Sequence, residues 1–598
     1  MVLWKADHPI IDIPTNVTTY QWAFESEEHS PVIRSPRNHG FYENASTKER
    51  LAFSHVKDLA THLHTALAKD HGFQPGDTIS IFAGNSVWYP VTLWACSRGG
   101  GKINGASPDY GVEEIVHALK TAGTKFVFTT EAGLERVQEA VERVGMGREM
   151  VFLLEGEGNG EVLSIKRLVE RGRKYPPEKS WRIPPGKNNK EVCGYLNFSS
   201  GTTGLPKAVE LSHHNIIAQC HQLRAYQAFD PGENYRCLAI TPVYHISGLV
   251  RYIHYPLLLN GNCYMLPAFN MDLFLTSIIT HRIRELILVP PLVIRLVRDP
   301  VVEEYLPDLR RIVKRWSSGS APTSPEIIHL LHQKFPQTGF RQGYGATESS
   351  GCITCHPPTH YDYKFAMTGG KLVPNTTAKI LSLESTCATQ PSREELGSNE
   401  IGEICARGPQ IALGYRNNPP ATAETFDRDG FLHTGDVGYF DARGLLHIVD
   451  RIKEMIKVRG QQVAPAELED LLLSHPGVAD CAVIPIPDAY SGEKPKAYVV
   501  LKAGVGVGRG RREEVLLGKE ILRFVRERKV GYKRLKEVEF TDLIPKSATG
   551  KILRRALKGE EGRVGRQRGW LSGKGIVSNT SSSQRGLMEL TDSSGSLL

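Results

Sequence analysis

Segments typical of strands and of helices alternate over residues 51–150, and this alternation limits the folds open to the chain. Residues 78–83 and 125–129 have the composition of short buried strands, while 51–68 and 111–121 carry apolar residues at helical spacing. Because such alternation is typical of a parallel sheet covered by helices, the pattern predicts an α/β fold.

The pattern changes twice further along the chain, which at 598 residues is too long for one ordinary domain. Residues 383–399 are polar and aperiodic and are predicted to form a surface loop. Short strands and tight turns follow from about residue 400, and strands and helices return beyond 450. The stretch 559–598 holds 8 Gly and 8 Ser in 40 residues, so we expect a disordered tail.

Charge and hydropathy exclude several classes of function. The 73 Lys and Arg exceed the 65 Asp and Glu by 8, a mild excess that suits a small anionic ligand but predicts no nucleic-acid partner. The apolar run 286–294 has nine residues, whereas a membrane span needs about 20, so no integral membrane association is expected.

Targeting signals and cysteine positions indicate a reducing compartment such as the cytoplasm. The N-terminus does not read as a signal peptide, and the final Ser-Leu-Leu does not match the peroxisomal Ser-Lys-Leu signal. We therefore expect a cytoplasmic protein with reduced thiols, and a peroxisomal location stays open. The Cys352-Ile-Thr-Cys355-His356 sequence matches a haem-attachment pattern, which we interpret as a chance occurrence.

A loop rich in Gly, Ser and Thr follows the predicted strand 192–198 directly. It reads Ser199-Ser-Gly-Thr-Thr-Gly-Leu-Pro-Lys207 and does not match the Walker A spacing. Glycines allow the backbone to approach phosphate oxygens closely, hydroxyl groups donate hydrogen bonds, and Lys207 adds positive charge. The loop therefore predicts a phosphate-binding site.

The sequence SSGTTGLPKAVELSHHN closely resembles the signature loop of the adenylate-forming superfamily, which includes acyl-CoA synthetases, luciferase and peptide-synthetase adenylation domains. Further matching segments follow in the family's order: QGYGATESS (342–350), GEICARGPQIALGY (402–415), HTGDVGYF (433–440), DRIKEMIKVRGQQVAPAELE (450–469) and PKSATGKILRRAL (545–557). Within the superfamily, the chain is most similar to 4-coumarate–CoA ligase-like enzymes.

The resemblance implies a two-domain architecture and a two-step reaction. A large N-terminal AMP-binding domain, 1–449, would carry β/α sheets and a β-rich subdomain, and Asp450 would be the hinge to a mobile α+β C-terminal domain, 451–558. The acid would react with MgATP to give acyl-AMP and pyrophosphate. A thiol, most simply that of coenzyme A, would then take the acyl group.

The resemblance also implies roles for individual residues. Thr347 would contact the α-phosphate, Glu348 would bind Mg²⁺, and Asp436 would bind the ribose hydroxyls. Lys551 would reach the α-phosphate and the substrate carboxylate. The full set implied for ATP and AMP is Ser199, Ser200, Gly201, Thr202, Thr203, Lys207, Gln342, Gly343, Tyr344, Thr347, Asp436, Arg451, Lys453, Lys457, Gln462 and Lys551.

A second set would bind the acid and the thiol. Arg459 and Gly460 match residues near the thiol acceptor, and His245 matches a catalytic histidine at the mouth of the acyl pocket. The implied acyl pocket is His245, Ser247, Gly319, Ser320 and Cys352. Because amino-acid-activating relatives carry an Asp in the segment 243–247 and this chain does not, we expect a medium- or long-chain fatty acid or an aryl acid. Ser247 replaces a frequent Tyr, which argues against hydroxycinnamate.

Three alternatives remain open at this point. The first is an acyl-AMP ligase that loads a separate carrier protein of a polyketide or non-ribosomal peptide pathway. The second is a luciferase-like oxygenase that catalyses the same first step. A nucleotide-binding protein without catalysis is the third. It is disfavoured because Lys207, Glu348, Asp436 and Lys551 are all present.

We predict that deletion of 559–598 leaves catalysis intact, because this stretch lacks the apolar periodicity needed to pack. The measurement is the rate of pyrophosphate release by the truncated and full-length enzymes. A truncated enzyme that is folded but inactive would contradict the prediction.

Overall fold

The computed structural model describes residues 2–34, 40–158, 161–199, 206–228, 234–383, 393–459, 461–488, 490–502, 511–547 and 550–558. The chain divides into two compact units. Unit 1 comprises Met1–Met455 and Lys546–Ile552, and unit 2 comprises Ile456–Pro545 and Leu553–Leu598. The predicted phosphate-loop residues Ser200–Thr203, the predicted acceptor-site residue Gly460 and the tail 559–598 lie outside the described residues.

A seven-stranded sheet in unit 1 has the order β20-β9-β8-β5-β4-β6-β7. Its strands are β4 (Thr78–Phe82), β5 (Lys102–Ala106), β6 (Thr124–Thr129), β7 (Val151–Leu153), β8 (Cys193–Ser199), β9 (Lys207–Ser212) and β20 (Gly414–Tyr415). The five strands from β8 to β7 are parallel, and β9 and β20 add antiparallel pairs. The α/β fold class predicted from the alternation is confirmed.

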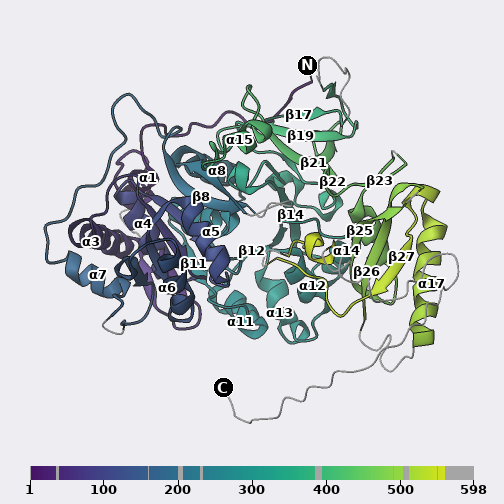
Figure 1. Ribbon diagram of the computed structural model, residues 1–598, viewed down its shortest axis with the longest axis horizontal. Coiled ribbons are helices and arrows are strands. Elements are labelled where there is room, and N and C mark those ends of the chain that lie inside the picture. Colours follow the sequence, from purple (N-terminus) through teal and green to yellow (C-terminus); the bar gives the residue numbers. More distant parts are fainter. Residues whose placement is uncertain are drawn as a thin grey trace, which may run out of the picture. The chain divides into compact units, whose positions relative to one another are not determined.

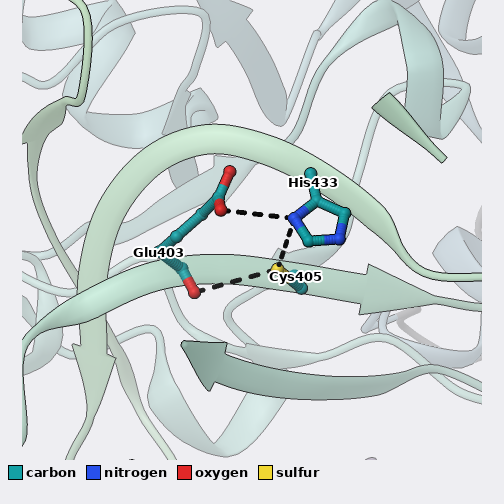
Figure 2. A group of neighbouring side chains, drawn as sticks. All are labelled: Glu403, Cys405 and His433. Carbon is teal, nitrogen blue, oxygen red and sulfur yellow. Dashed lines mark hydrogen bonds and ion pairs between the residues drawn. The ribbon is translucent and has the colours of Figure 1, made fainter. Parts of the chain in front are cut away.

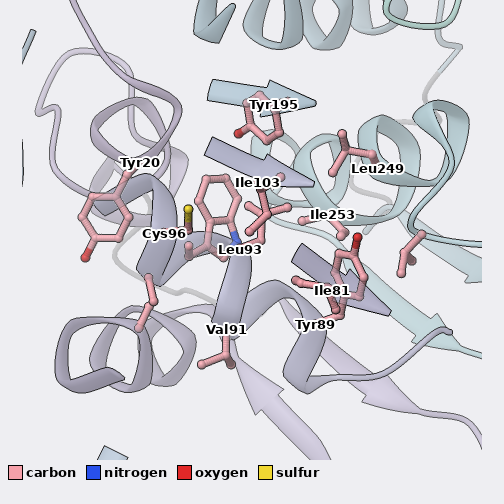
Figure 3. Packing of buried hydrophobic residues seen from close by; sticks show 14 of the residues in the cluster. Tyr20, Ile81, Tyr89, Val91, Leu93, Cys96, Ile103, Tyr195, Leu249 and Ile253 are labelled. Carbon is pink, nitrogen blue, oxygen red and sulfur yellow. The ribbon is translucent and has the colours of Figure 1, made fainter. Parts of the chain in front are cut away.

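Helices cover this sheet and bury its apolar side chains. The main ones are α1 (Thr19–Phe24), α3 (Phe53–His71), α4 (Trp88–Arg98), α5 (Val112–Ala122), α6 (Leu134–Arg143), α7 (Ile165–Gly172) and α8 (His213–Ala225). Helices α3 and α7 lie side by side (Figure 1). Figure 3 shows the core, in which Ile81 of β4 and Ile103 of β5 pack with α4 and with the π-helix η3 (Leu249–His254).

A second sheet has the order β12-β13-β14-β15-β16. Its strands are β12 (Glu285–Leu288), β13 (Arg315–Ser318), β14 (Gly339–Tyr344), β15 (Thr354–Cys355) and β16 (Lys371–Leu372). The first three are parallel, with Ile287 opposite Ser317 and Ser317 opposite Arg341. Four helices accompany this sheet: α11 (Met271–His281), α12 (Pro290–Arg298), α13 (Val302–Ile312) and α14 (Pro325–Lys334).

A smaller four-stranded sheet, of order β10-β11-β2-β3, shares the core of these two sheets. Its strands are β2 (Phe41–Asn44), β3 (Arg50–Ala52), β10 (Arg236–Ala239) and β11 (Asn262–Met265). Strand β11 pairs in parallel with both β10 and β2.

The β-rich part of unit 1 is a sheet of six strands whose pairs are all antiparallel. They are β1 (Trp4–Lys5), β17 (Thr377–Leu381), β18 (Glu395–Leu396), β19 (Gly402–Arg407), β21 (Leu432–Phe440) and β22 (Leu446–Arg451). Strand β18 corrects the prediction of an entire loop over 383–399. Its two residues pair with Ile380 and Leu381 of β17, an interaction between distant residues that the local polar composition does not reveal.

Unit 2 is a small α+β unit. A mixed sheet is formed by β23 (Ile456–Val458), β24 (Gln461–Val463), β25 (Val478–Asp488), β26 (Gly492–Leu501) and β27 (Glu537–Phe540). Helices α16 (Pro465–Leu473) and α17 (Arg511–Arg528) share its apolar core. Among the described residues of both units, no helix combines the length and the apolar character needed to cross a bilayer.

Candidate active site

Unit 1 contains a cavity of about 660 Å³, here called the large cavity because more residues line it than line the cavity of unit 2. Residues of β8, β9, β12, β13, β14 and β21 contribute to its wall, together with the segment Lys546–Ile552, which groups with unit 1. The predicted site residues that line it are Ser199, Lys207, His245, Ser247, Gly319, Ser320, Gly343, Thr347, Glu348, Cys352, Arg451, Lys453 and Lys551.

Lys207 and Glu348 are joined through Tyr415. The Lys207 ammonium lies 4.6 Å from the centre of the Tyr415 ring, and the Tyr415 hydroxyl donates to Glu348 Oε1 at 2.8 Å. Burial raises the pKa of Tyr415, and the neighbouring Glu348 carboxylate raises it further, so this hydroxyl keeps its proton. One Glu348 oxygen thus has a protein partner, and the carboxylate still lines the cavity.

Backbone pairing fixes this group of residues. Tyr415 lies on β20 opposite Val209 of β9, so it sits beside the strand that begins at Lys207. The Ala412 N–H donates to the Glu348 carbonyl at 2.8 Å, which ties the same segment to the turn carrying Thr347 and Glu348. Sequence reasoning assigned no role to Tyr415, although it ends the GEICARGPQIALGY match.

Asp436 is held between Tyr344 and Arg451. Its Oδ2 accepts from the Tyr344 hydroxyl at 2.9 Å, and its Oδ1 lies 2.9 Å from Arg451 Nε. Burial raises the pKa of Asp436, and the charges of Arg451 and Lys551 and the Tyr344 hydrogen bond oppose this rise. Because each carboxylate oxygen has two lone pairs, Asp436 can accept further hydrogen bonds from a ligand hydroxyl.

The turn before Asp436 rests on a second carboxylate, Glu403. Glu403 Oε1 accepts the Gly435 N–H at 3.1 Å, while Oε2 pairs with Arg393 and with His433 Nδ1, the latter at 3.2 Å. Figure 2 shows Glu403 and Cys405 on one strand with His433 facing both. Burial raises the pKa of Glu403, but the hydrogen bonds from His433 and Arg393 outweigh this and leave it below its ordinary value.

Glu403, Cys405 and His433 offer one ligand atom each within 4.8 Å of one another. The carboxylate already has three hydrogen-bond donors, and burial raises the pKa of the Cys405 thiol, which keeps it protonated and therefore a weak metal ligand. Glu403 and His433 instead have a structural role, because Glu403 accepts the Gly435 N–H of the Gly435–Asp436 turn and pairs with His433. Sequence reasoning missed Glu403, although the residue opens the GEIC match.

The predicted acyl-pocket residues come together at another part of the cavity wall. His245 Nδ1 lies 3.1 Å from Ser247 Oγ, and burial lowers the pKa of His245 to about 4, so its ring is neutral near pH 7. Ser320, just beyond β13, has φ of 71°, a left-handed conformation that is uncommon for a residue with a Cβ. Strained backbone of this kind is often found at binding sites.

Other predicted residues lie elsewhere. Gln342 donates through Nε2 to the Ala366 carbonyl, and Asp450 of β22 accepts the Arg451 N–H at 2.7 Å. In unit 2, Lys457 and Gln462 are exposed and face each other across β23 and β24.

Unit 2 has a cavity of its own, of about 710 Å³, here called the basic cavity. It contains the predicted acceptor-site residue Arg459, whose φ is 51° and whose guanidinium lies 4.1 Å from the centre of the Tyr490 ring. Its described wall includes five cationic side chains and no Asp or Glu. These cations are Arg459, Lys494, Arg526, Arg534 and Lys536.

Comparisons with known proteins identify a family and several relatives of this chain. The family model of AMP-binding enzymes matches residues 32–416, and that of the AMP-binding enzyme C-terminal domain matches 467–551. The probable 4-coumarate–CoA ligase 1 of Dictyostelium discoideum is 36% identical over 81% of this chain and 85% of its own length. The 4-coumarate–CoA ligase 2 of Oryza sativa subsp. japonica is 33% identical over 93% of this chain and 95% of its own.

Solved structures support the fold. ATP-bound MatB from Rhodopseudomonas palustris aligns with a TM-score of 0.77 over 92% of this chain and 99% of its own, at 24% identity. The anthranilate CoA ligase AuaEII in complex with anthranoyl-AMP aligns with a TM-score of 0.76 at 21% identity, covering 92% of this chain and 98% of its own. At these identities the likeness concerns the fold alone.

We predict that Glu403→Ala raises the KM for ATP about tenfold, because the Gly435 N–H loses its acceptor and the Asp436 turn loosens. Glu403→Gln keeps an oxygen at Oε1 and is expected to retain most of the affinity. Initial rates at varied ATP and at varied acid provide the test. An unchanged KM for ATP in folded Glu403→Ala would show that Glu403 does not position Asp436.

Proposed function

The chain belongs to the AMP-binding enzyme family, and we propose that it activates a fatty or aryl carboxylic acid as acyl-AMP and transfers the acyl group to coenzyme A. Family membership confirms the predicted class, an AMP-forming acid–thiol ligase. The observation that carries the proposal is the large cavity, where Lys207, Glu348 and Lys551 of three distant segments line one space.

The first step joins a carboxylate to the α-phosphate of ATP, and both groups are anions. Three lysines line the large cavity: Lys207, Lys453 and Lys551. In our proposal Lys207 neutralises the β- and γ-phosphates, and Lys551 stabilises the charge that develops as the carboxylate attacks. Thr347 donates to the α-phosphate.

Glu348 has the chemistry needed to hold Mg²⁺. Mg²⁺ prefers oxygen ligands such as carboxylates. The Glu348 carboxylate lines the cavity, and the Tyr415 hydroxyl donates to one of its two oxygens. The Tyr415 hydroxyl would orient the carboxylate, because it holds one oxygen. When bound, Mg²⁺ would neutralise part of the triphosphate charge.

Asp436 is proposed to bind the ribose. Its two oxygens face Tyr344 and Arg451, which fix the orientation of the carboxylate and leave lone pairs for two hydroxyl groups. Tyr344 and Gly343 are proposed to border the adenine. Gln342 is proposed to act there through its backbone, because its side chain is bonded to Ala366.

The basic cavity of unit 2 supports coenzyme A as the acceptor. Coenzyme A carries a diphosphate and a 3′-phosphate, and the five cationic side chains of this wall, Arg459 included, suit such a polyanion. Two of them, Lys494 and Lys536, also pair with Asp488. A phosphopantetheine arm on a carrier protein has one phosphate, whose negative charge is smaller than the positive charge of this cavity wall.

Asp450 remains the proposed hinge, with domains 1–449 and 451–558, and a cytoplasmic location remains a prediction from the sequence.

The proposed function is tested with a panel of fatty and aryl acids, ATP and coenzyme A, by following pyrophosphate release and acyl-CoA by mass spectrometry. We expect pyrophosphate and a thioester with at least one acid. Pyrophosphate release without thioester would favour the carrier-protein alternative, and the absence of both across the panel would overturn the proposal.

We predict that Lys551→Ala slows acyl-adenylate formation about 100- to 1000-fold, because a charge-stabilising group is lost from the large cavity. Thioester formation from supplied acyl-AMP is expected to survive much better. The two half-reactions are measured separately, with Lys558→Ala, an exposed lysine outside the cavity wall, as the matched control. Equal loss of both half-reactions would indicate a structural lysine instead.

A further inference from the structure

Arg251 lines the large cavity and has no role in the proposal above. It lies on the π-helix η3, between Leu249 and Ile253. These two neighbours are buried in the apolar core shown in Figure 3, whereas Arg251 is half-buried against the cavity. Short π-helical turns are frequent at functional sites, and here the turn places a cation at an otherwise buried position.

The Arg251 guanidinium has a weak partner in the protein. Its Nη2 lies 3.7 Å from Cys352 Sγ, at the long end of the range for a contact with sulfur. Within the described part of the chain, no carboxylate lies within 4.0 Å of it. Charged side chains that lose much of their solvent contact are normally paired, and the half-buried Arg251 has no carboxylate partner among the described residues.

The charges behind Arg251 do not supply that counter-ion. Glu285 Oε1 lies 3.3 Å from Arg341 Nη1, and Glu285 Oε2 lies 3.2 Å from Arg315 Nη2. Burial and the neighbouring Arg341 lower the pKa of Arg251, but Cys352, Cys355 and, more weakly, Glu285 raise it and leave it above its ordinary value. Glu285 is therefore already paired with two guanidinium groups, and Arg251 adds a further positive charge that no carboxylate of the described residues contacts.

The sheet places this excess charge away from the phosphate end of the cavity. Val289, Gly319 and Gly343 line the cavity at the carboxyl edge of β12–β14, where the predicted acyl-pocket residues lie. One pleat deeper, Ile287, Ser317 and Arg341 form the next row across the strands and also line the cavity. Two residues along a strand span about 7 Å, so Arg341 lies roughly that much further in. Arg251 approaches the acyl pocket from η3, beside Cys352.

We propose that the acid substrate carries a second carboxylate at its far end, bound by Arg251. This inference rests on the proposed function and narrows it from carboxylic acids in general to dicarboxylic acids activated at one end. Leu223, Val250 and Ile287 line the same cavity and suit an apolar chain between the two carboxylates. A fatty acid would instead bring a methyl group to a guanidinium that needs a counter-ion.

Binding is measured first, because it does not depend on turnover. The probes are acyl-sulfamoyl adenosines, stable mimics of the acyl-adenylate, with hexanedioyl, octanedioyl and decanedioyl chains, each matched to the monoacyl chain of equal length. By calorimetry on the full chain, the best dicarboxylate probe is expected to bind about 10- to 100-fold more tightly than its monoacyl match.

Arg251→Met keeps the bulk of the side chain and removes its charge. It is expected to abolish the preference for the dicarboxylate probe while leaving monoacyl affinity and the KM for ATP within about twofold, and Arg251→Lys is expected to restore part of the preference. Arg311→Met, which removes an exposed arginine paired with Asp308, is the matched control and is expected to behave as wild type.

The outcomes separate the two proposals. If neither class of probe binds the wild-type enzyme, this inference is overturned, and acyl-adenylate formation is overturned with it if the panel of fatty and aryl acids also releases no pyrophosphate. If monoacyl probes bind as tightly as dicarboxylate probes, or if Arg251→Met weakens both equally, the inference is overturned and the proposed function stands. A preference for the dicarboxylate that Arg251→Met removes supports both.

Discussion

Activation of an acid by ATP brings two negatively charged groups together, and their repulsion is the constraint that governs the large cavity. Coulomb energy falls with distance, so the cations that offset this repulsion must lie close to the reacting atoms. The chain supplies them from β9, from the stretch after β22 and from residues 546–552. Lys207 begins β9, and the backbone pairing of β9 with β20 fixes the position of this strand without using any charged side chain.

Much of this arrangement could be predicted from the sequence because it depends on local signals. Alternating apolar periods predict the parallel sheet. In the stretch from about residue 400, where tight turns are predicted, the turn at Asp441–Gly444 joins β21 to β22. The cavity residues Lys207, Thr347, Glu348, Arg451 and Lys551 lie in short segments whose resemblance to a family is specific. Their convergence on one space follows from the fold and needed the structure.

Other features could not be predicted because they arise from contacts between distant residues. Tyr415 and Glu403 lie in a matched segment, yet their roles depend on two hydrogen bonds between distant residues. The Tyr415 hydroxyl donates to Glu348, and the Gly435 N–H donates to Glu403. Arg251 stands in a largely apolar stretch, a local signal that something unusual is present. The sequence does not tell whether such a cation is paired inside the protein, and here the deciding fact is that Glu285 is shared with two other arginines.

The π-helical turn at η3 affects how the side chains that line this cavity can differ between related enzymes. A π-turn closes its hydrogen bonds over one residue more than an α-helical turn does, and η3 covers Leu249–His254. Leu249, Val250, Tyr252 and Ile253 pack in the core, whereas Arg251 among them is half-buried and lines the cavity. Loss of a single residue here would rotate the following side chains by about one α-helical step, roughly 100°. Insertion and deletion, as well as substitution, can therefore change which side chain faces the acid.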